Sequence, residues 1–348
     1  MTVSLPVAKA SELAYLRLSR KDLEACEAFF HTFGLHTAKR TDTHLWLRAA
    51  GSAPFCLEIE KGEDAFLGAG LCVTKSELIA LGDLPTAHSG TGPIIGPGGG
   101  ELVRFIMPCG FTLDAVAGRS PDAEISLRDP LPVNSGGTIN RLNLGQRPDL
   151  SNANVLRLGH AVMEVVDFHA NLDFIRRHFG LIPTDIQELA DGTPVVAFNR
   201  FDCGDKPADH HALVIAQSFD NRFNHAAFEC LDLDSVATGN LLMKQGGYRH
   251  AWGIGRHILG SQIFDYWQDD TGAKFEHYAD GDMFDANHPT EHHRLCGNAQ
   301  HQWGPDMPKS FLDAGMSPCR LVKVIRNIRN SDELTFQKLM AIKKAAAE

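Results

Sequence analysis

Two histidines and one glutamate in the second half of the chain have the residue types and settings of ligands for a divalent metal ion. His160, His225 and Glu276 each lie in a stretch with the pattern of a β-strand. Alternate side chains of a strand share one face, so three strands of a curved sheet could present these groups to a single point. Two imidazoles and one carboxylate on one face of an ion leave its other positions open, which suits Fe(II) and O2 chemistry. A lone histidine in a strand more often has a structural role than a metal-binding one. Glu276 is more informative, because burying its carboxylate would require a cation or hydrogen bonds.

The composition narrows the classes of protein to consider. Of the 17 histidines among 348 residues, four precede residue 160, which places metal or proton chemistry in the second half. Acidic residues outnumber Lys and Arg by 43 to 33 without any basic run, so neither nucleic acid nor a membrane surface is an expected partner. There is no apolar run of about 18 residues, no signal-peptide core, and no C-x-x-C pair among the eight cysteines. These features predict a cytoplasmic protein with reduced thiols.

The elements that must position the three groups occur in two similar copies. Residues 13–35 and 158–181 both begin as a strand, pass an acidic turn, and continue as a helix that ends in Phe-Gly-Leu. Gly34 and Gly180 are expected to end these helices in the left-handed conformation. The chain therefore reads as an internal duplication with a period of about 146 residues.

Each half repeats once more at a finer scale. A strand, a helix and about three further strands occur twice per half, which predicts an α+β fold of four tandem βαβββ modules. Residues 119–147, rich in Pro, Gly, Ser and Asn, are predicted to link the halves. The tail from residue 280 is predicted to be an ordered loop up to residue 318, with a terminal amphipathic helix at 331–347.

The sequence around Glu276 resembles a known signature. The stretch GRHILGSQIFDYWQDDTGAKFE, residues 255–276, resembles the motif of the type I extradiol ring-cleavage dioxygenases of the vicinal oxygen chelate superfamily. The matching residues are His257, Tyr266, Gly272 and Glu276. The chain departs from the motif at Asp265, where an aliphatic residue is usual, and at Asp270, where proline is usual. Neither position supplies a metal ligand, so the departures concern turn geometry and the pocket lining.

The resemblance extends upstream and covers roughly residues 155–282, with a fainter likeness over 10–118. LGHAVMEV contains His160 at the position of the first metal ligand, and DHHALVIAQSFDNRFNHAAFE contains His225 at that of the second. His211 matches the acid/base histidine of the family, and strand alternation is expected to turn His210 the opposite way.

The resemblance implies a fold, an activity and a cofactor. It implies two similar half-open barrel domains: a non-catalytic domain at 1–135 and a catalytic metal-binding domain at 136–285, followed by a loop or lid and a terminal helix at 286–348. The implied reaction inserts O2 into a substituted catechol beside its two hydroxyls, giving a ring-opened semialdehyde or keto acid in aromatic catabolism. Fe(II) is the implied cofactor, although Mn(II) suits the same ligands. A homo-oligomer is also expected.

The remaining site residues are interpretations of the same resemblance. His211 would move the substrate proton, while His257 and Tyr266 would hydrogen-bond a substrate oxygen. Trp252 and Trp267 could line the pocket, although bulky aromatic residues in strands more often belong to the core. If the tail forms a lid, His293 or Arg294 could meet a carboxylate on the substrate. The histidines of the tail have no spacing that fits a compact second metal site.

The first half lacks two of the three ligands. Asp114 stands at the position of Glu276, but Ala14 or Tyr15 stands at that of His160, and Gly68 near that of His225. The first half is therefore expected to hold no metal. Two alternatives remain open: a glyoxalase-like isomerase or lyase, which would need a fourth protein ligand, and a metal-free aromatic-binding protein, which would not need the three ligands that are present.

Overall fold

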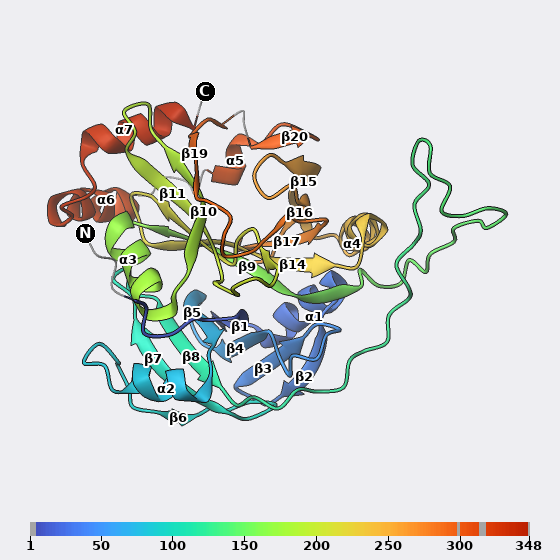
Figure 1. The fold of residues 1–348 in the computed structure, drawn as a ribbon, viewed down its shortest axis with the longest axis horizontal. Coiled ribbons are helices and arrows are strands. Elements are labelled where there is room, and N and C mark those ends of the chain that lie inside the picture. The colour runs from blue at the N-terminus through green and yellow to red at the C-terminus, as the bar shows by residue number, and fades with distance from the viewer. Residues whose placement is uncertain (1–4, 298–299, 313–317, 347–348) are drawn as a thin grey trace.

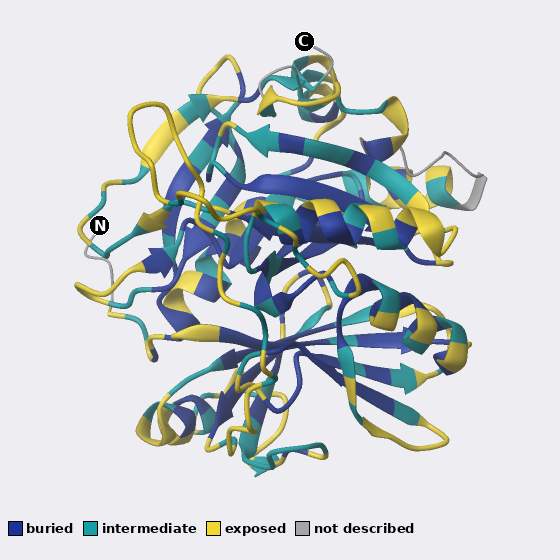
Figure 2. Cartoon of the chain, turned by 90° about the vertical axis from the view of Figure 1, so that its right-hand side faces the viewer, coloured by how far each residue is buried: buried dark blue, intermediate teal, exposed yellow. Residues whose placement is uncertain are grey.

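A computed structural model describes residues 5–297, 300–312 and 318–346. The chain folds into two curled sheets, one from each half, which lie beside each other (Figure 1). Helices lie against both sheets, and buried residues are concentrated in the strands (Figure 2). This arrangement confirms the predicted α+β fold of two half-barrels. No helix in the described part of the chain is long and apolar enough to cross a membrane.

The first half forms an eight-stranded sheet in the order β2-β3-β4-β1-β5-β8-β7-β6. Its elements are β1 (Glu12–Arg20), α1 (Leu23–Phe33), β2 (His36–Arg40), β3 (His44–Arg48), β4 (Leu57–Lys61), β5 (Ala65–Cys72), α2 (Lys75–Gly82), β6 (Gly92–Pro93), β7 (Glu101–Ile106) and β8 (Thr112–Ala117).

The second half forms a ten-stranded sheet in the order β19-β10-β11-β13-β9-β14-β17-β16-β15-β20. Its elements before the tail are β9 (Val155–Val165), α3 (Phe168–Phe179), β10 (Ile182–Glu188), β11 (Pro194–Arg200), β12 (Ala208–Asp209), β13 (Leu213–Gln217), β14 (Arg222–Cys230), α4 (Leu233–Gln245), β15 (Arg249–His257), β16 (Ile263–Gln268) and β17 (Lys274–Ala279). Without its two edge strands, this sheet has the same order as the first, so the duplication is visible in the topology.

The tail contains more regular structure than the sequence predicts. Its elements are β18 (Met283–Phe284), β19 (Glu291–Arg294), β20 (His301–Trp303), α5 (Lys309–Leu312), α6 (Pro318–Asn330) and α7 (Phe336–Ala345). β19 and β20 extend the second sheet at its two opposite edges. The terminal helix starts later than predicted, at residue 336, because the Thr335 hydroxyl accepts a hydrogen bond from the Lys338 amide and caps it there.

The helices end as the glycine positions predict. Gly34 follows α1 with φ of 106°, and Gly180 follows α3 with φ of 70°, both in the left-handed region. α1 buries Phe29, Phe30 and Phe33. One apolar cluster runs through both halves, since Phe30 and Phe33 pack on aromatic residues of β14 and β17.

Between the halves, residues 118–150 contain no helix or strand. Residues 120–125 are hydrogen-bonded to the first half, and a later part of the segment extends well away from the two sheets (Figure 1). Arg128 nevertheless ties this linker to the second half, because its guanidinium donates to both carboxylate oxygens of Asp232 at 2.7 and 2.8 Å.

Candidate metal centre

Three adjacent strands of the second sheet direct the proposed ligands to its concave face. On β14, Ala227 lies opposite His160 of β9 on one side and opposite Glu276 of β17 on the other. Residues directly opposite each other in a sheet share a face, and His225 precedes Ala227 by two positions. His160, His225 and Glu276 therefore point the same way.

The ligand atoms of these three side chains all lie within 4.8 Å of one another. One oxygen of Glu276, Oε2, is 3.3 Å from Nε2 of His160 and 3.5 Å from Nε2 of His225. Glu276 is fully buried, and neither of its carboxylate oxygens accepts a hydrogen bond within the described structure. A buried carboxylate without donors is costly, and a divalent cation between the three groups would remove that cost. The donor set therefore fits a metal ion.

Asn224, which the sequence analysis did not single out, orients one ligand. Its side-chain oxygen lies 2.8 Å from Nδ1 of His225, and its amide nitrogen donates to Glu164 at 2.6 Å. Since the amide oxygen can only accept, Nδ1 of His225 must donate. Nε2 is then unprotonated, and its lone pair can bind a metal. Burial, followed by the charge of His160, holds the pKa of His225 well below its ordinary value and favours this neutral form.

His211 lies against the ligand group, with its ring centroid 4.1 Å from that of His160. Burial, and then the neighbouring His160, lower the pKa of His211 well below its ordinary value. The expectation that His210 faces away is wrong. Residues 210–212 lie between β12 and β13, so strand alternation does not apply, and His210 is buried with its Nδ1 only 2.8 Å from Nδ1 of His211.

His257 and Tyr266 lie on the other side of the ligand group. Tyr266 is opposite Glu276 in the sheet, and His257 Nε2 is 3.8 Å from the second carboxylate oxygen. His257 Nδ1 lies 2.9 Å from the carbonyl oxygen of Gln300 and must donate to it, so Nε2 accepts from the Tyr266 hydroxyl at 2.9 Å. Burial raises the pKa of Tyr266 well above its ordinary value, which keeps the phenol as a donor.

The four predicted substrate contacts occupy different places. Trp252 lies next to the site: its ring is nearly parallel to that of Tyr266 at 5.8 Å, and its indole N–H donates to Pro305. Trp267, by alternation, lies on the opposite face of β16 and donates to Asp265. His293 reaches Asp185 at 3.0 Å, whereas Arg294 is exposed at the edge strand β19.

A cavity of about 320 Å³ lies at the first residues of β14 and β17, and none of the three proposed ligands lines it. Asn224, Lys274 and Phe311 help to line it. Lys274 lies opposite His225 in the sheet and donates to the carbonyl oxygen of Phe311 at 2.8 Å. Burial lowers the pKa of Lys274 to about 8. Lys274, opposite His225, and Phe311, which packs on Tyr266, connect this cavity to the surroundings of the ligand group.

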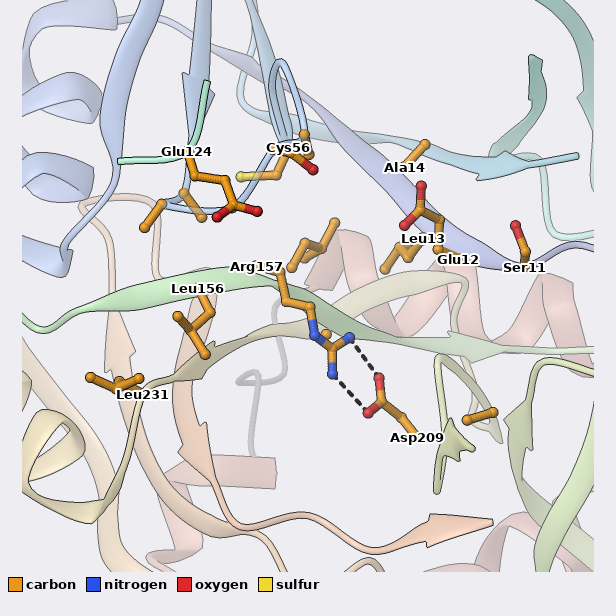
Figure 3. A pocket seen from close by; sticks show the side chains of 18 of the residues that line it. Ser11, Glu12, Leu13, Ala14, Cys56, Glu124, Leu156, Arg157, Asp209 and Leu231 are labelled. Carbon is orange, nitrogen blue, oxygen red and sulfur yellow. Dashed lines mark hydrogen bonds and ion pairs between the residues drawn. The ribbon is translucent and has the colours of Figure 1, made fainter. Parts of the chain in front are cut away.

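A larger cavity of about 920 Å³ lies between the two halves (Figure 3). Leu13 and Cys56 line it from the first half and Arg157 and Asp209 from the second, with the guanidinium of Arg157 paired to both oxygens of Asp209. None of the three proposed ligands lines this cavity, so it is separate from the metal centre.

The matching place in the first half is closed by side chains. Tyr15 and Asp114 lie opposite Gly70, in the positions that His160 and Glu276 hold in the second half. The Tyr15 hydroxyl donates to Asp114 at 3.0 Å, and Arg104 donates twice to it at 2.7 and 2.8 Å. Asp114 is thus buried with a cation supplied by the chain itself.

Comparisons with known proteins concern the fold and part of the sequence. No protein-family model matches the chain. Metapyrocatechase 2 of Cupriavidus necator is 33% identical over 157 residues, which are 45% of this chain and 47% of that protein. The match therefore spans about half the length of this curated relative.

Several solved structures share the fold across most of the chain. The Mn(II)-bound glyoxalase of Novosphingobium aromaticivorans superposes with a TM-score of 0.74 at 20% identity, covering 89% of this chain and 97% of that one. Homoprotocatechuate 2,3-dioxygenase of Arthrobacter globiformis gives 0.71 at 19% identity, covering 91% and 95%. An extradiol ring-cleaving dioxygenase of B. fuscum gives 0.72 at 19% identity, covering 89% and 84%. The predicted resemblance to the type I extradiol dioxygenases is confirmed, in fold over 89% to 91% of the chain and in sequence over 45% of it.

Proposed function

We propose that this chain is an extradiol dioxygenase that opens the ring of a substituted catechol with O2 at an Fe(II) site. The observation that carries the proposal is the buried group of His160, His225 and Glu276, with a carboxylate that has no other described donor, flanked by His211 on one side and the His257–Tyr266 pair on the other. The sequence similarity to a metapyrocatechase supports it. The catalytic part of the proposal falls within residues 136–285.

Each residue has a proposed role. Bound Fe(II), or Mn(II) on the same ligands, would supply the Lewis acidity and electrons that a catechol and O2 need to react. His211 would accept a proton from one substrate hydroxyl and later return it, which its neutral resting form allows. The Tyr266 hydroxyl, which donates its proton to His257, would accept a hydrogen bond from a substrate hydroxyl and orient the ring. Trp252 and Phe311 pack around Tyr266 and would limit the access of water.

The setting of the enzyme is also part of the proposal. We propose a cytoplasmic homo-oligomer acting in aromatic catabolism. This part rests on the family resemblance and on the sequence composition.

A glyoxalase-like isomerase or lyase is the second candidate, because a glyoxalase shares the fold. Such an enzyme would require a fourth protein ligand. Asp114, the first-half residue in the position of Glu276, already pairs with Arg104 and Tyr15. Three protein ligands leave the other positions of a bound metal for exchangeable partners, which favours a reaction in which catechol and O2 both reach the metal.

The decisive experiment loads the protein with Fe(II) under anaerobic conditions and then adds air and a panel of substituted catechols. Ring cleavage predicts O2 uptake equal to the catechol consumed and a yellow ring-opened product. Glu276→Gln is the inactive control. Isomerisation of an aldehyde–thiol adduct without O2 uptake would instead establish the glyoxalase alternative, and a failure to bind metal would favour the metal-free binding protein.

A further inference from the structure

A continuous line of hydrogen bonds leads from His211 away from the metal centre. Nδ1 of His211 lies 2.8 Å from Nδ1 of His210, and Nε2 of His210 lies 2.6 Å from a carboxylate oxygen of Asp185. The other oxygen of Asp185 lies 3.0 Å from Nε2 of His293. His210, His211 and Asp185 are each no more than 5% exposed.

Hydrogen-bond chemistry determines where the protons lie along this line. The Asp185 carboxylate only accepts, so Nε2 of His210 carries a proton. In neutral His210 the other nitrogen, Nδ1, is then an acceptor, and the proton between the two rings belongs to Nδ1 of His211. Nε2 of His211 is left as an unprotonated base for the substrate.

We propose that His210 and Asp185 form a proton store that converts His211 from a base into an acid within one turnover. When Nε2 of His211 takes the proton from a substrate hydroxyl, its Nδ1 proton moves to Nδ1 of His210. His211 is then neutral with its proton on Nε2, ready to donate, and the charge lies on His210 beside Asp185. The reverse transfer follows when His211 returns its proton, so every proton is accounted for.

The surroundings of His210 suit this role. Its ring packs among Phe198, Phe284 and His211, and Gly260 approaches so closely that a Cβ there would lie 3.1 Å from Nδ1. Burial raises the pKa of Asp185, but the hydrogen bonds from His210 and His293 outweigh it, and the net pKa lies below the ordinary value. A charged carboxylate is thus held in contact with the ring that would receive the positive charge.

The backbone beside His210 is fixed independently of its ring. Its amide donates to the Asp282 carbonyl, and its carbonyl accepts from the Thr184 hydroxyl at 2.7 Å. A side-chain substitution at residue 210 can therefore test the ring with its backbone anchors in place.

The test, which rests on the proposed function, uses His210→Gln. The Gln side-chain oxygen can still accept from Nδ1 of His211, but it cannot carry a transferred proton. We expect kcat to fall about 10²-fold while KM for the catechol changes less than about 3-fold. Asp185→Asn, which removes the balancing charge, should give a similar loss. His250→Gln is the matched control, because His250 forms an equivalent 2.7 Å pair with Asp265 away from His211.

Nitrogen-15 NMR of histidine in the Zn(II)-loaded protein gives a readout that does not depend on activity. We expect His211 to carry its proton on Nδ1, both in the wild type and in His210→Gln. The proposal is overturned if His211 is protonated on Nε2 in the wild type, or if an active wild type loses no kcat in His210→Gln. If the wild type opens no catechol ring, the proposed function is wrong. That result comes from the wild type alone and is therefore distinct from a failure of the proton-store proposal.

Discussion

At the scale of single residues, the two halves differ at a few equivalent positions. These differences give a proposed metal centre in the second half and a buried ion pair in the first. Where the second half has Glu276 beside Tyr266, the first half has Asp114 beside Arg104. The guanidinium occupies the position from which Tyr266 could reach a substrate. Gly68, at the first-half position of His225, leaves no room for any side chain, because a Cβ would lie 2.0 Å from the Thr112 carbonyl oxygen. The first half therefore cannot build the same site by one substitution.

The metal site predicts the behaviour of Glu276→Gln. The amide keeps the shape of the side chain but removes the charge that balances the ion, so metal occupancy should fall sharply and turnover should be nearly abolished. The wild type should bind one Fe(II) per chain, measured by elemental analysis, with an unchanged circular dichroism spectrum in the variant. Glu229→Gln on β14 is the control. Full occupancy in Glu276→Gln would refute the ligand assignment.

His211→Phe should separate metal binding from proton transfer. The three ligands are untouched, so Fe(II) and catechol binding should remain close to wild type, as measured anaerobically. Ring opening should slow by about 10²–10⁴-fold, the usual contribution of one positioned proton-transfer group. A loss confined to metal binding would mean that His211 is a ligand rather than an acid/base group.

At the scale of elements, the start of α4 fastens the linker between the halves. Asp232 caps α4 by accepting from the Ser235 amide, and it also receives Arg128 from the linker. Burial raises the pKa of Asp232, but hydrogen bonds from Arg128 and Ser235 outweigh it and lower the pKa from 3.8 to about 2. One carboxylate thus stabilises a helix end and holds the linker against the second half.

Two substitutions should distinguish these roles of Asp232. Asn is a good N-cap but carries no charge, so Asp232→Asn should mainly release Arg128 and speed amide hydrogen exchange around residue 128. Asp232→Ala should also lose the cap, at about 1 kcal/mol of unfolding free energy. Equal rates of amide hydrogen exchange near residue 128 in the wild type and in both variants would contradict the proposal that Asp232 holds the linker through Arg128.

The same carboxylate predicts a pH dependence. Because the folded pKa lies below the unfolded value, the stabilisation is complete above about pH 4 and is lost as the pH falls from about 4 to about 2. The difference in unfolding free energy between the wild type and Asp232→Asn should therefore shrink across this range in urea titrations. If the difference in unfolding free energy instead grows as the pH falls, the ionised form of Asp232 does not stabilise the folded state.

At the scale of the whole molecule, polar contacts join the two halves behind the metal centre. His277 of β17 donates to the Phe33 carbonyl oxygen at 2.6 Å and stacks on the Phe33 ring. Arg20, at the end of β1, pairs with Asp269 at 2.9 Å, and both side chains are buried. Together with the shared apolar cluster, these contacts should make the halves unfold as one unit.

Arg20→Met should destabilise the whole molecule by about 3 kcal/mol, because it leaves the Asp269 carboxylate buried without its cation. Chemical denaturation should show one transition at lower denaturant in the variant, followed by fluorescence and by circular dichroism. Lys21→Met, which removes an exposed ion pair with Glu63, should leave the transition unchanged. Two separate transitions in the wild type would show that the halves unfold independently.

Local patterns in the sequence were enough for the repeated helices, their glycine caps and the α+β fold, because strand alternation and helix periodicity act over a few residues. The same alternation predicts that His160, His225 and Glu276 can share a face. Strand alternation gave a wrong prediction for His210, because this residue lies just outside a strand.

Only the tertiary structure brought together groups that are distant in sequence. Asp185 lies 25 residues from His210, Asp269 lies 249 residues from Arg20, and β19 and β20 join opposite edges of one sheet. Each of these pairings depends on which strands become neighbours and in what register, a property of the packed sheet. For that reason the sequence determined the types of the proposed ligands, whereas the tertiary structure decided which buried charges meet and which proton path they form.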